Sequence, residues 1–154
     1  MGGKRTLTAA ARRVEPVDSA ALPRGALVLV DSAPIIYLLE YHPRFAARFR
    51  PLFDRQAAGE VVFAVTTIAM AEVLAGPLGK GQEVLARRYR DVMESWQVVE
   101  LSADIAESAA RIRGSLKMSL ADAVQVASAL AISADALVTH DRDFSTVTAL
   151  RVMG

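Results

Sequence analysis

Continuous apolar runs alternate with amphipathic stretches along this chain, and the alternation predicts where the strands lie. The runs at 26–30 and 61–65 are apolar at every position, which is typical of strands buried on both faces of a parallel sheet. Shorter runs predict further strands at 97–101 and 136–139, and residues 148–152 are a candidate edge strand.

Helical stretches separate these strands, and most of them carry their own start and stop signals. A Ser, Thr or Asp stands before several of them as a capping residue, and His42-Pro43, Gly59 and Gly76-Pro77 are expected stops. Pro51 predicts a break or kink within the second stretch. The expected helices cover about 34–41, 45–58, 68–75, 82–95, 103–116 and 120–133.

Strands that alternate with helices predict a parallel α/β sheet with right-handed crossovers. The length of 154 residues, of which 53% are hydrophobic, suits one domain with a sizeable core. We expect that domain to cover residues 25–154. Residues 1–24 show no sustained period, so we expect a flexible and basic N-terminal extension there. Its first 13 residues contain no acid and four basic side chains, those of Lys4, Arg5, Arg12 and Arg13.

Composition restricts the chemistry that the domain can carry. There is no cysteine, which excludes disulfides, thiolate metal sites and cysteine nucleophiles, and fits a reducing cytoplasm. The only histidines are His42 and His140, so a metal site would depend on oxygen ligands. Oxygen ligands suit hard cations such as Mg²⁺ or Mn²⁺.

The charge distribution limits how the domain would meet a nucleic acid. The formal net charge is +1, but the first 13 residues hold four positive charges, so the other 141 residues carry a net −3. If this domain handles nucleic acid, metal ions must offset its acids or a local basic strip must attract the strand. No apolar run reaches the roughly 18 residues of a membrane span, so we expect no membrane association.

Four acids stand where a sheet of this kind would bring them together. Asp31 ends the first apolar strand, and Asp141 follows the fourth strand. Glu72 is the only charged residue between Glu60 and Lys80, and Asp122 is similarly isolated within an alanine-rich helical stretch. The carboxyl ends of parallel strands and the helix starts that follow them share one rim, where such folds bind ligands. Clustered carboxylates repel one another, so they take up protons or share a cation. A carboxylate-held metal can activate water for attack on a phosphodiester.

Each acid also has a structural alternative. Asp31 can simply cap the helix that follows it, and Asp122 completes a capping box with Ser119. Asp141 is in a polar turn, where an aspartate is common. Glu72 has no capping register. The accessory candidates are weaker: Asp143 as a turn residue, Thr139 as a hydrogen-bond donor to a ligand carboxylate, and Ser32 beside Asp31.

Taken together, four segments resemble the PIN-domain family, especially the VapC-like toxin ribonucleases of bacterial toxin–antitoxin pairs. These segments surround Asp31, Glu72, Asp122 and the Thr139–Asp143 turn, and they occur in the order typical of that family. They cover 29–39, 66–76, 120–130 and 137–144.

The resemblance implies a three-layer α/β/α fold with a central parallel five-stranded sheet in the order 3-2-1-4-5. It implies Mg²⁺- or Mn²⁺-dependent cleavage of RNA, with Asp31, Glu72, Asp122 and Asp141 as the catalytic and metal-binding acids. Asp31 and Asp122 would hold the metal most directly. It also implies a homodimer, inhibited by a cognate antitoxin protein.

Three other functions compete with the toxin ribonuclease. The first is a housekeeping PIN-domain nuclease that processes RNA. The second is a PIN-like scaffold that binds RNA or protein without cutting it. The third, a phosphoacceptor receiver-like module, needs an acidic pair before the first helix and a lysine after a late strand. Here Asp31 stands alone, and His140-Asp141 follows Thr139.

Overall fold

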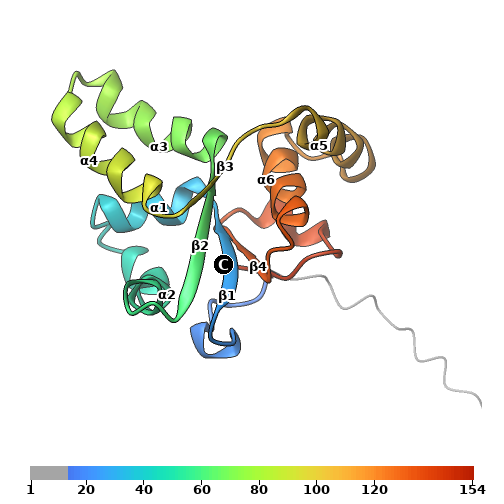
Figure 1. The fold of residues 1–154 in the computed structure, drawn as a ribbon, viewed down its shortest axis with the longest axis horizontal. Helices are drawn as coiled ribbons and strands as arrows, with labels where there is room; N and C mark the ends of the chain where they lie inside the picture. Colours follow the sequence, from blue (N-terminus) through green and yellow to red (C-terminus); the bar gives the residue numbers. More distant parts are fainter. Residues whose placement is uncertain (1–13) are drawn as a thin grey trace, which may run out of the picture.

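A computed structural model describes residues 14–154, and its centre is a parallel sheet (Figure 1). The five strands lie in the order β3-β2-β1-β4-β5, and every adjacent pair is parallel. The order and direction expected from the sequence are therefore confirmed. The strands are β1 (Ala26–Val30), β2 (Val61–Thr66), β3 (Gln97–Val99), β4 (Ala136–Val138) and β5 (Val152–Met153).

Helices cover both faces of the sheet, which gives three layers (Figure 1). On one face, Val28, Val30 and Phe63 pack against the first four helices. On the other face, Leu29 and Leu137 pack against the last two. The period of two in a strand explains why neighbouring apolar residues enter different cores. The helices are α1 (Ser32–Leu39), α2 (Ala46–Ala57), α3 (Thr67–Gly79), α4 (Glu83–Glu94), α5 (Ala103–Leu116) and α6 (Leu120–Ala131).

One proline signal misplaced a helix boundary. The expected stop at Gly76-Pro77 is wrong, because α3 continues to Gly79 and the left-handed glycine of the following turn is Gly81, with φ of 68°. Pro51 lies inside α2 without ending it.

The C-terminal part also differs from its expected boundaries. The expected strand at 148–152 is wrong in its limits, because β5 covers only Val152–Met153. The expected strand at 97–101 is also too long, because β3 ends at Val99. The polar turn after β4 forms the 3-10 helix η2 (Arg142–Thr146), so the backbone turns away from the sheet before β5 begins.

The described part of the expected N-terminal extension packs on the domain. Glu15 forms an isolated parallel bridge with Met153 and an ion pair of 2.7 Å with Arg151. The short 3-10 helix η1 (Ser19–Ala21) leads to Leu22, which is buried in the core beside α2. The four expected basic side chains lie outside the described residues. No helix in the described part of the chain combines the length and apolar character that crossing a membrane requires.

Candidate active site

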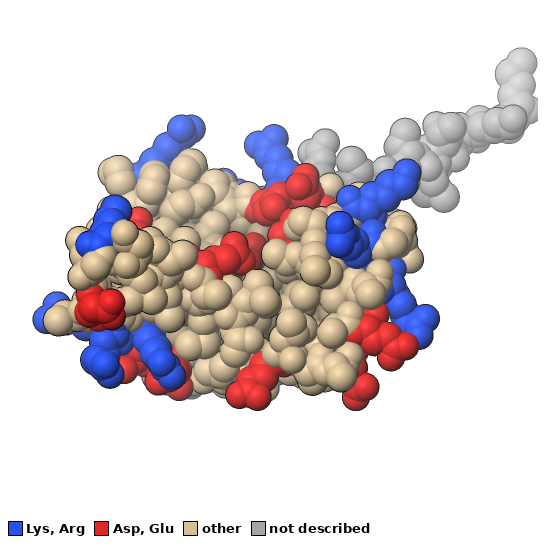
Figure 2. Space-filling view, turned by 90° about the horizontal axis from the view of Figure 1, so that it is seen from above, with Lys and Arg blue, Asp and Glu red and all other residues tan. Residues whose placement is uncertain are grey.

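The carboxyl ends of the central strands place the predicted site residues at one end of the sheet. Val30 of β1 lies opposite Val138 of β4, so the next residues, Asp31 and Thr139, are neighbours. The Asp31 N–H also donates to the Val138 carbonyl at 2.8 Å, which extends the strand pairing to the acid. Figure 2 looks onto this end of the molecule and shows carboxylates near its middle, with lysine and arginine side chains around the margin.

Asp31 is a buried carboxylate whose oxygens are occupied by neutral donors. It is 7% exposed and caps α1. Its Oδ1 accepts from the Ser32 N–H at 2.8 Å and from Gln125 Nε2 at 2.9 Å, while its Oδ2 accepts from Thr139 Oγ1 at 2.8 Å. Three donors from three parts of the chain therefore fix its position and offset the cost of burying it.

Gln125 is a site residue that the sequence analysis did not identify. It is 1% exposed, and its Oε1 accepts a hydrogen bond of 2.5 Å from Thr66 Oγ1. Thr66 also caps α3 by accepting from the Ala69 N–H at 3.0 Å. A continuous chain of bonds thus joins the start of α3 through Gln125 to Asp31. The available signal was a long polar side chain one turn after Asp122 in an otherwise apolar helix.

Glu72 lies beside Asp31, in the second turn of α3. Ser32 Oγ donates to its Oε2 at 3.3 Å, so Ser32 bridges the two acids through its backbone and side chain. Burial raises the pKa of Glu72, the negative charge of Asp31 raises it further, and the Ser32 hydrogen bond opposes both effects. Glu72 is exposed, and its contact with Ser32 joins it to Asp31.

Asp122 is half-buried in the first turn of α6. Its N–H donates to Ser119 Oγ at 3.2 Å, so Ser119 caps the helix as its sequence pattern predicts. Burial raises the pKa of the Asp122 carboxyl to about 6; a hydrogen bond with Ser119 lowers it, and the charges of Asp141 and Asp31 raise it. Helix capping and membership of the acidic group therefore coexist at this residue.

Asp141 and Asp143 approach Asp122 from the turn after β4. Each of these three residues offers a carboxylate oxygen, and the three oxygens all lie within 4.8 Å of one another. Asp141 caps η2 by accepting from the Asp143 N–H at 2.8 Å, and its own N–H donates to Thr139 Oγ1 at 3.0 Å. Asp143, an accessory candidate from sequence, thus stands in the same group as Asp122.

The acids form two groups that interact electrostatically. Asp31 and Glu72 are bridged by Ser32, and Asp31 also raises the pKa of Asp122, which belongs to the second group. Among the described residues, the ion pairs involve other acids, and none pairs a lysine or arginine with these five. Several carboxylate oxygens without a cationic side chain are a donor set that suits a hard divalent cation.

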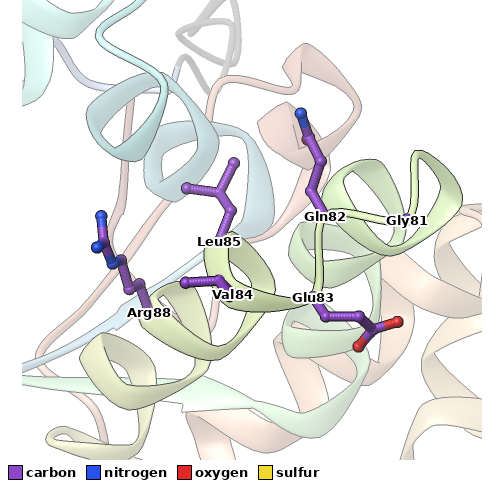
Figure 3. A pocket seen from close by; sticks show the side chains of 6 residues that line it. All are labelled: Gly81, Gln82, Glu83, Val84, Leu85 and Arg88. Carbon is purple, nitrogen blue, oxygen red and sulfur yellow. The ribbon is translucent and has the colours of Figure 1, made fainter.

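A separate depression lies at the turn between α3 and α4 (Figure 3). It has a volume of about 410 Å³, and none of the candidate acids lines it. Its wall consists of Gly81, Gln82, Glu83, Val84, Leu85 and Arg88.

Comparison with known proteins agrees with this architecture. A family model described as PIN domain matches residues 28–150. A toxin–antitoxin complex from Klebsiella pneumoniae has a similar fold, with a TM-score of 0.64, 24% identity, and coverage of 80% of this chain and 94% of that chain.

Two further solved structures are similar in fold at lower identity. One is VapBC2 from Rickettsia felis bound to a DNA fragment from its promoter, with a TM-score of 0.65, 20% identity and coverage of 83% of this chain and 97% of that chain. The other is VapC20 from Mycobacterium tuberculosis, described as a Sarcin-Ricin loop cleaving toxin, with a TM-score of 0.64, 17% identity and coverage of 80% and 98%. A search of curated proteins gave no match.

Proposed function

The chain belongs to the PIN-domain family, and from this premise we propose that it is a divalent-metal-dependent endoribonuclease, the toxin of a toxin–antitoxin pair. The observation that carries the proposal is the acidic group of Asp122, Asp141 and Asp143, in which three carboxylate oxygens lie within 4.8 Å of one another. Ser32 bridges the other two acids, Asp31 and Glu72, and the charge of Asp31 raises the pKa of Asp122. Acids so close to one another, without a cationic partner, suit a site completed by Mg²⁺ or Mn²⁺.

We assign the metal-binding role to Asp31, Glu72, Asp122 and Asp141, with Asp143 as an accessory ligand. A bound divalent cation supplies Lewis acidity and a water of lowered pKa at sites of this kind. Thr139 and Ser32 hold the acids in place through their hydroxyl groups. Glu72, which Ser32 holds beside Asp31, orients the attacking water and accepts its proton, because a carboxylate at the edge of the metal-binding group is placed to act as a general base.

The toxin assignment rests on similarity of fold to toxin components over nearly their whole length, 94–98% of the three chains compared. With this assignment we also propose that the protein has a cognate antitoxin as partner, forms a homodimer and is cytoplasmic. A housekeeping nuclease would share the chemistry but not the partner. Induced expression therefore separates the two: a toxin arrests growth, and co-expression of a small protein encoded beside it restores growth.

The chemical proposal is tested by incubating the inhibitor-free protein with total RNA in Mg²⁺ or Mn²⁺ and mapping the new ends. We expect discrete cuts that disappear in chelator. The matched control is Asp122→Asn, which keeps the shape of the side chain and removes one charge. An intact RNA profile in both metals would contradict the nuclease proposal and favour a non-cleaving scaffold.

A further inference from the structure

Four rings lie together next to the acidic groups, where α1, α2 and the turn after β4 meet. The Phe45 ring centroid is 4.9 Å from that of His42 and 4.6 Å from that of His140. Tyr37 is 5.0 Å from Phe45 and 5.4 Å from His140. All four side chains are partly exposed, whereas Phe49, which contacts Tyr37 and His140, is buried at 1% exposure. We call these four residues the ring platform.

Hydrogen bonds hold the platform rings in place. The Tyr37 hydroxyl and His140 Nδ1 are 2.8 Å apart. His42 Nδ1 accepts from the backbone N–H groups of Arg44 and Phe45 at 3.2 and 3.1 Å. Rings fixed in this way lose little conformational entropy when a ligand stacks on them.

The platform is continuous with the candidate site along the chain. His140 stands between Thr139, which donates to Asp31, and Asp141, which belongs to the metal-binding group. Tyr37 is on α1, the helix that Asp31 caps. A strand whose phosphate lay at the acids would therefore pass over or beside these rings.

Exposed arginines occur on the chain segment that carries Phe45. Arg44, Arg48 and Arg50 are exposed and occur between Glu40 and Asp54 with no acid among them. The Arg44 guanidinium lies 5.2 Å from the Phe45 ring centroid.

The other side of the platform carries charges of both signs. Arg142 is exposed in η2, two residues after His140, and Arg48 is on α2, three residues after Phe45. Glu40, the residue after α1, lies beside Gly76 of α3. The platform thus has arginines on its α2 side, while Asp141 and Asp143 follow His140 along the chain.

We propose that the ring platform binds an unstacked base of a single-stranded RNA segment, while Arg44 and Arg142 contact the flanking phosphates. The inference rests on the proposed ribonuclease function and adds to it a path for the substrate. Aromatic side chains stack on any base, and arginines pair with phosphates, so the combination is typical of single-strand binding. Bases within a duplex are already stacked and do not fit this surface.

The test measures binding of a fluorescent single-stranded oligoribonucleotide by the full chain carrying Asp122→Asn, with chelator, so that the RNA stays intact. In this background Phe45→Leu keeps an apolar side chain against Tyr37 but removes the aromatic ring. We expect about tenfold weaker binding, within the range for loss of one base–aromatic stack, and recovery with Phe45→Tyr. Binding of a duplex of the same length changes less than twofold. The control is Tyr41→Ala, because Tyr41 is 78% exposed and takes no part in the ring contacts that define the platform.

Salt dependence separates stacking from charge. Arg44→Ala lowers the slope of log binding constant against log salt concentration by about 0.7, the value for one single-strand phosphate contact, whereas Phe45→Leu leaves the slope unchanged. The matched control is Arg111→Ala on α5, which removes the same charge from a side chain paired with Glu107. Melting curves confirm that each variant is folded.

Wild-type affinity in Phe45→Leu, or equal losses for single strand and duplex, would overturn the platform and leave a partner protein as the occupant of this surface. Failure of the nuclease proposal gives a different result. Then the wild type cuts no RNA in Mg²⁺ or Mn²⁺, yet Phe45→Leu still weakens single-strand binding, which supports the platform.

Discussion

The two acidic groups of the site differ in how their charge is accommodated. Asp31 is buried, and Ser32, Gln125 and Thr139 supply three neutral hydrogen-bond donors to its oxygens. Asp122 is only half-buried, but Asp141 adds negative charge beside it and its pKa rises to about 6. Hydrogen bonds therefore already satisfy Asp31 in the folded chain, while Asp122 is stabilised by a proton or a cation. Asp31 is a ligand held in a fixed position, and Asp122 is where metal and protons compete.

The largest expected effect is loss of cleavage when either group loses a charge. Asp31→Asn and Asp122→Asn should each reduce RNA cleavage at least about a hundredfold, since changing even a residue that only supports a metal ligand costs about ten- to a hundredfold. The measurement is the initial rate on one RNA at saturating Mn²⁺, with both proteins shown to be folded. If a variant retains more than a tenth of wild-type activity, the replaced acid is not part of the catalytic site.

The same two substitutions should have opposite effects on stability without metal. Asp122→Asn relieves repulsion from Asp141, so in chelator at neutral pH we expect it to be at least as stable as the wild type. Asp31→Asn turns an amide N–H₂ toward Gln125 or Thr139, both donors, and should lower the free energy of unfolding by about 1–3 kcal/mol. The clustered acids alone suggest that Asp31→Asn is stabilising, and the three donors reverse that expectation. Urea denaturation measures the free energy of unfolding of both variants. An equal change in the two would contradict the expected difference between Asp31 and Asp122.

The next largest effect concerns Gln125, which holds Asp31 in position. Gln125→Ala removes the link between Thr66 and Asp31 and leaves every proposed ligand residue in the chain. We expect cleavage to fall about ten- to a hundredfold, as for residues that orient metal ligands, and the apparent Mn²⁺ affinity to weaken. Ser128→Ala is the control, because Ser128 is equally buried at 1% exposure one turn further along α6. If both variants lose only stability and keep wild-type metal affinity, Gln125 has no positioning role.

Gln125 also shows where sequence reasoning ends. Apolar runs were enough to place β1, β2 and β4 closely, because a strand buried on both faces has few alternatives. A glutamine in a helix, in contrast, is usually solvent-exposed, and only the packing of α6 against the sheet buries this one.

Local signals failed where the tertiary structure overrides them. Gly76-Pro77 is a typical helix stop, yet Pro77 is buried inside α3 and Gly76 keeps a helical backbone. Asp143 reads as a turn residue, and its approach to Asp122 depends on η2, which the sequence pattern did not predict. The acids at strand ends and in first helical turns were identifiable because topology alone brings them to one rim.

The metal should stabilise the fold through the Asp122 group. At a Mn²⁺ concentration a hundred times the dissociation constant, binding to the folded state adds about 2.7 kcal/mol, which raises the melting temperature by about 5–10 °C. Asp122→Asn should lose most of this rise. Asp143→Asn should lose part of it, because Asp143 is the most exposed of the three. Asp91→Asn, an exposed acid on α4, is the control for nonspecific binding. Identical melting curves with and without Mn²⁺ would count against the metal site.

The smallest effect is a pH dependence whose sign depends on the metal. The pKa of Asp122 is higher in the folded state, about 6 against an ordinary value of 3.8, so without metal the folded chain binds more protons between these values. Stability contributed by this group is therefore present below about pH 4 and falls as pH rises to about 6. Glu72, whose pKa is also raised, acts in the same direction. The effect is reduced by the partial solvent exposure of the carboxyl.

With Mn²⁺ the sign reverses, because a carboxylate must lose its proton to bind the ion. Stabilisation by metal should therefore grow over the same interval of pH in which the metal-free protein weakens. The measurement is the difference in free energy of unfolding between the wild type and Asp122→Asn, from pH 4 to 7, in chelator and in Mn²⁺. Since other titrating groups cancel in that difference, slopes of equal sign in the two conditions would mean that proton and metal do not share Asp122.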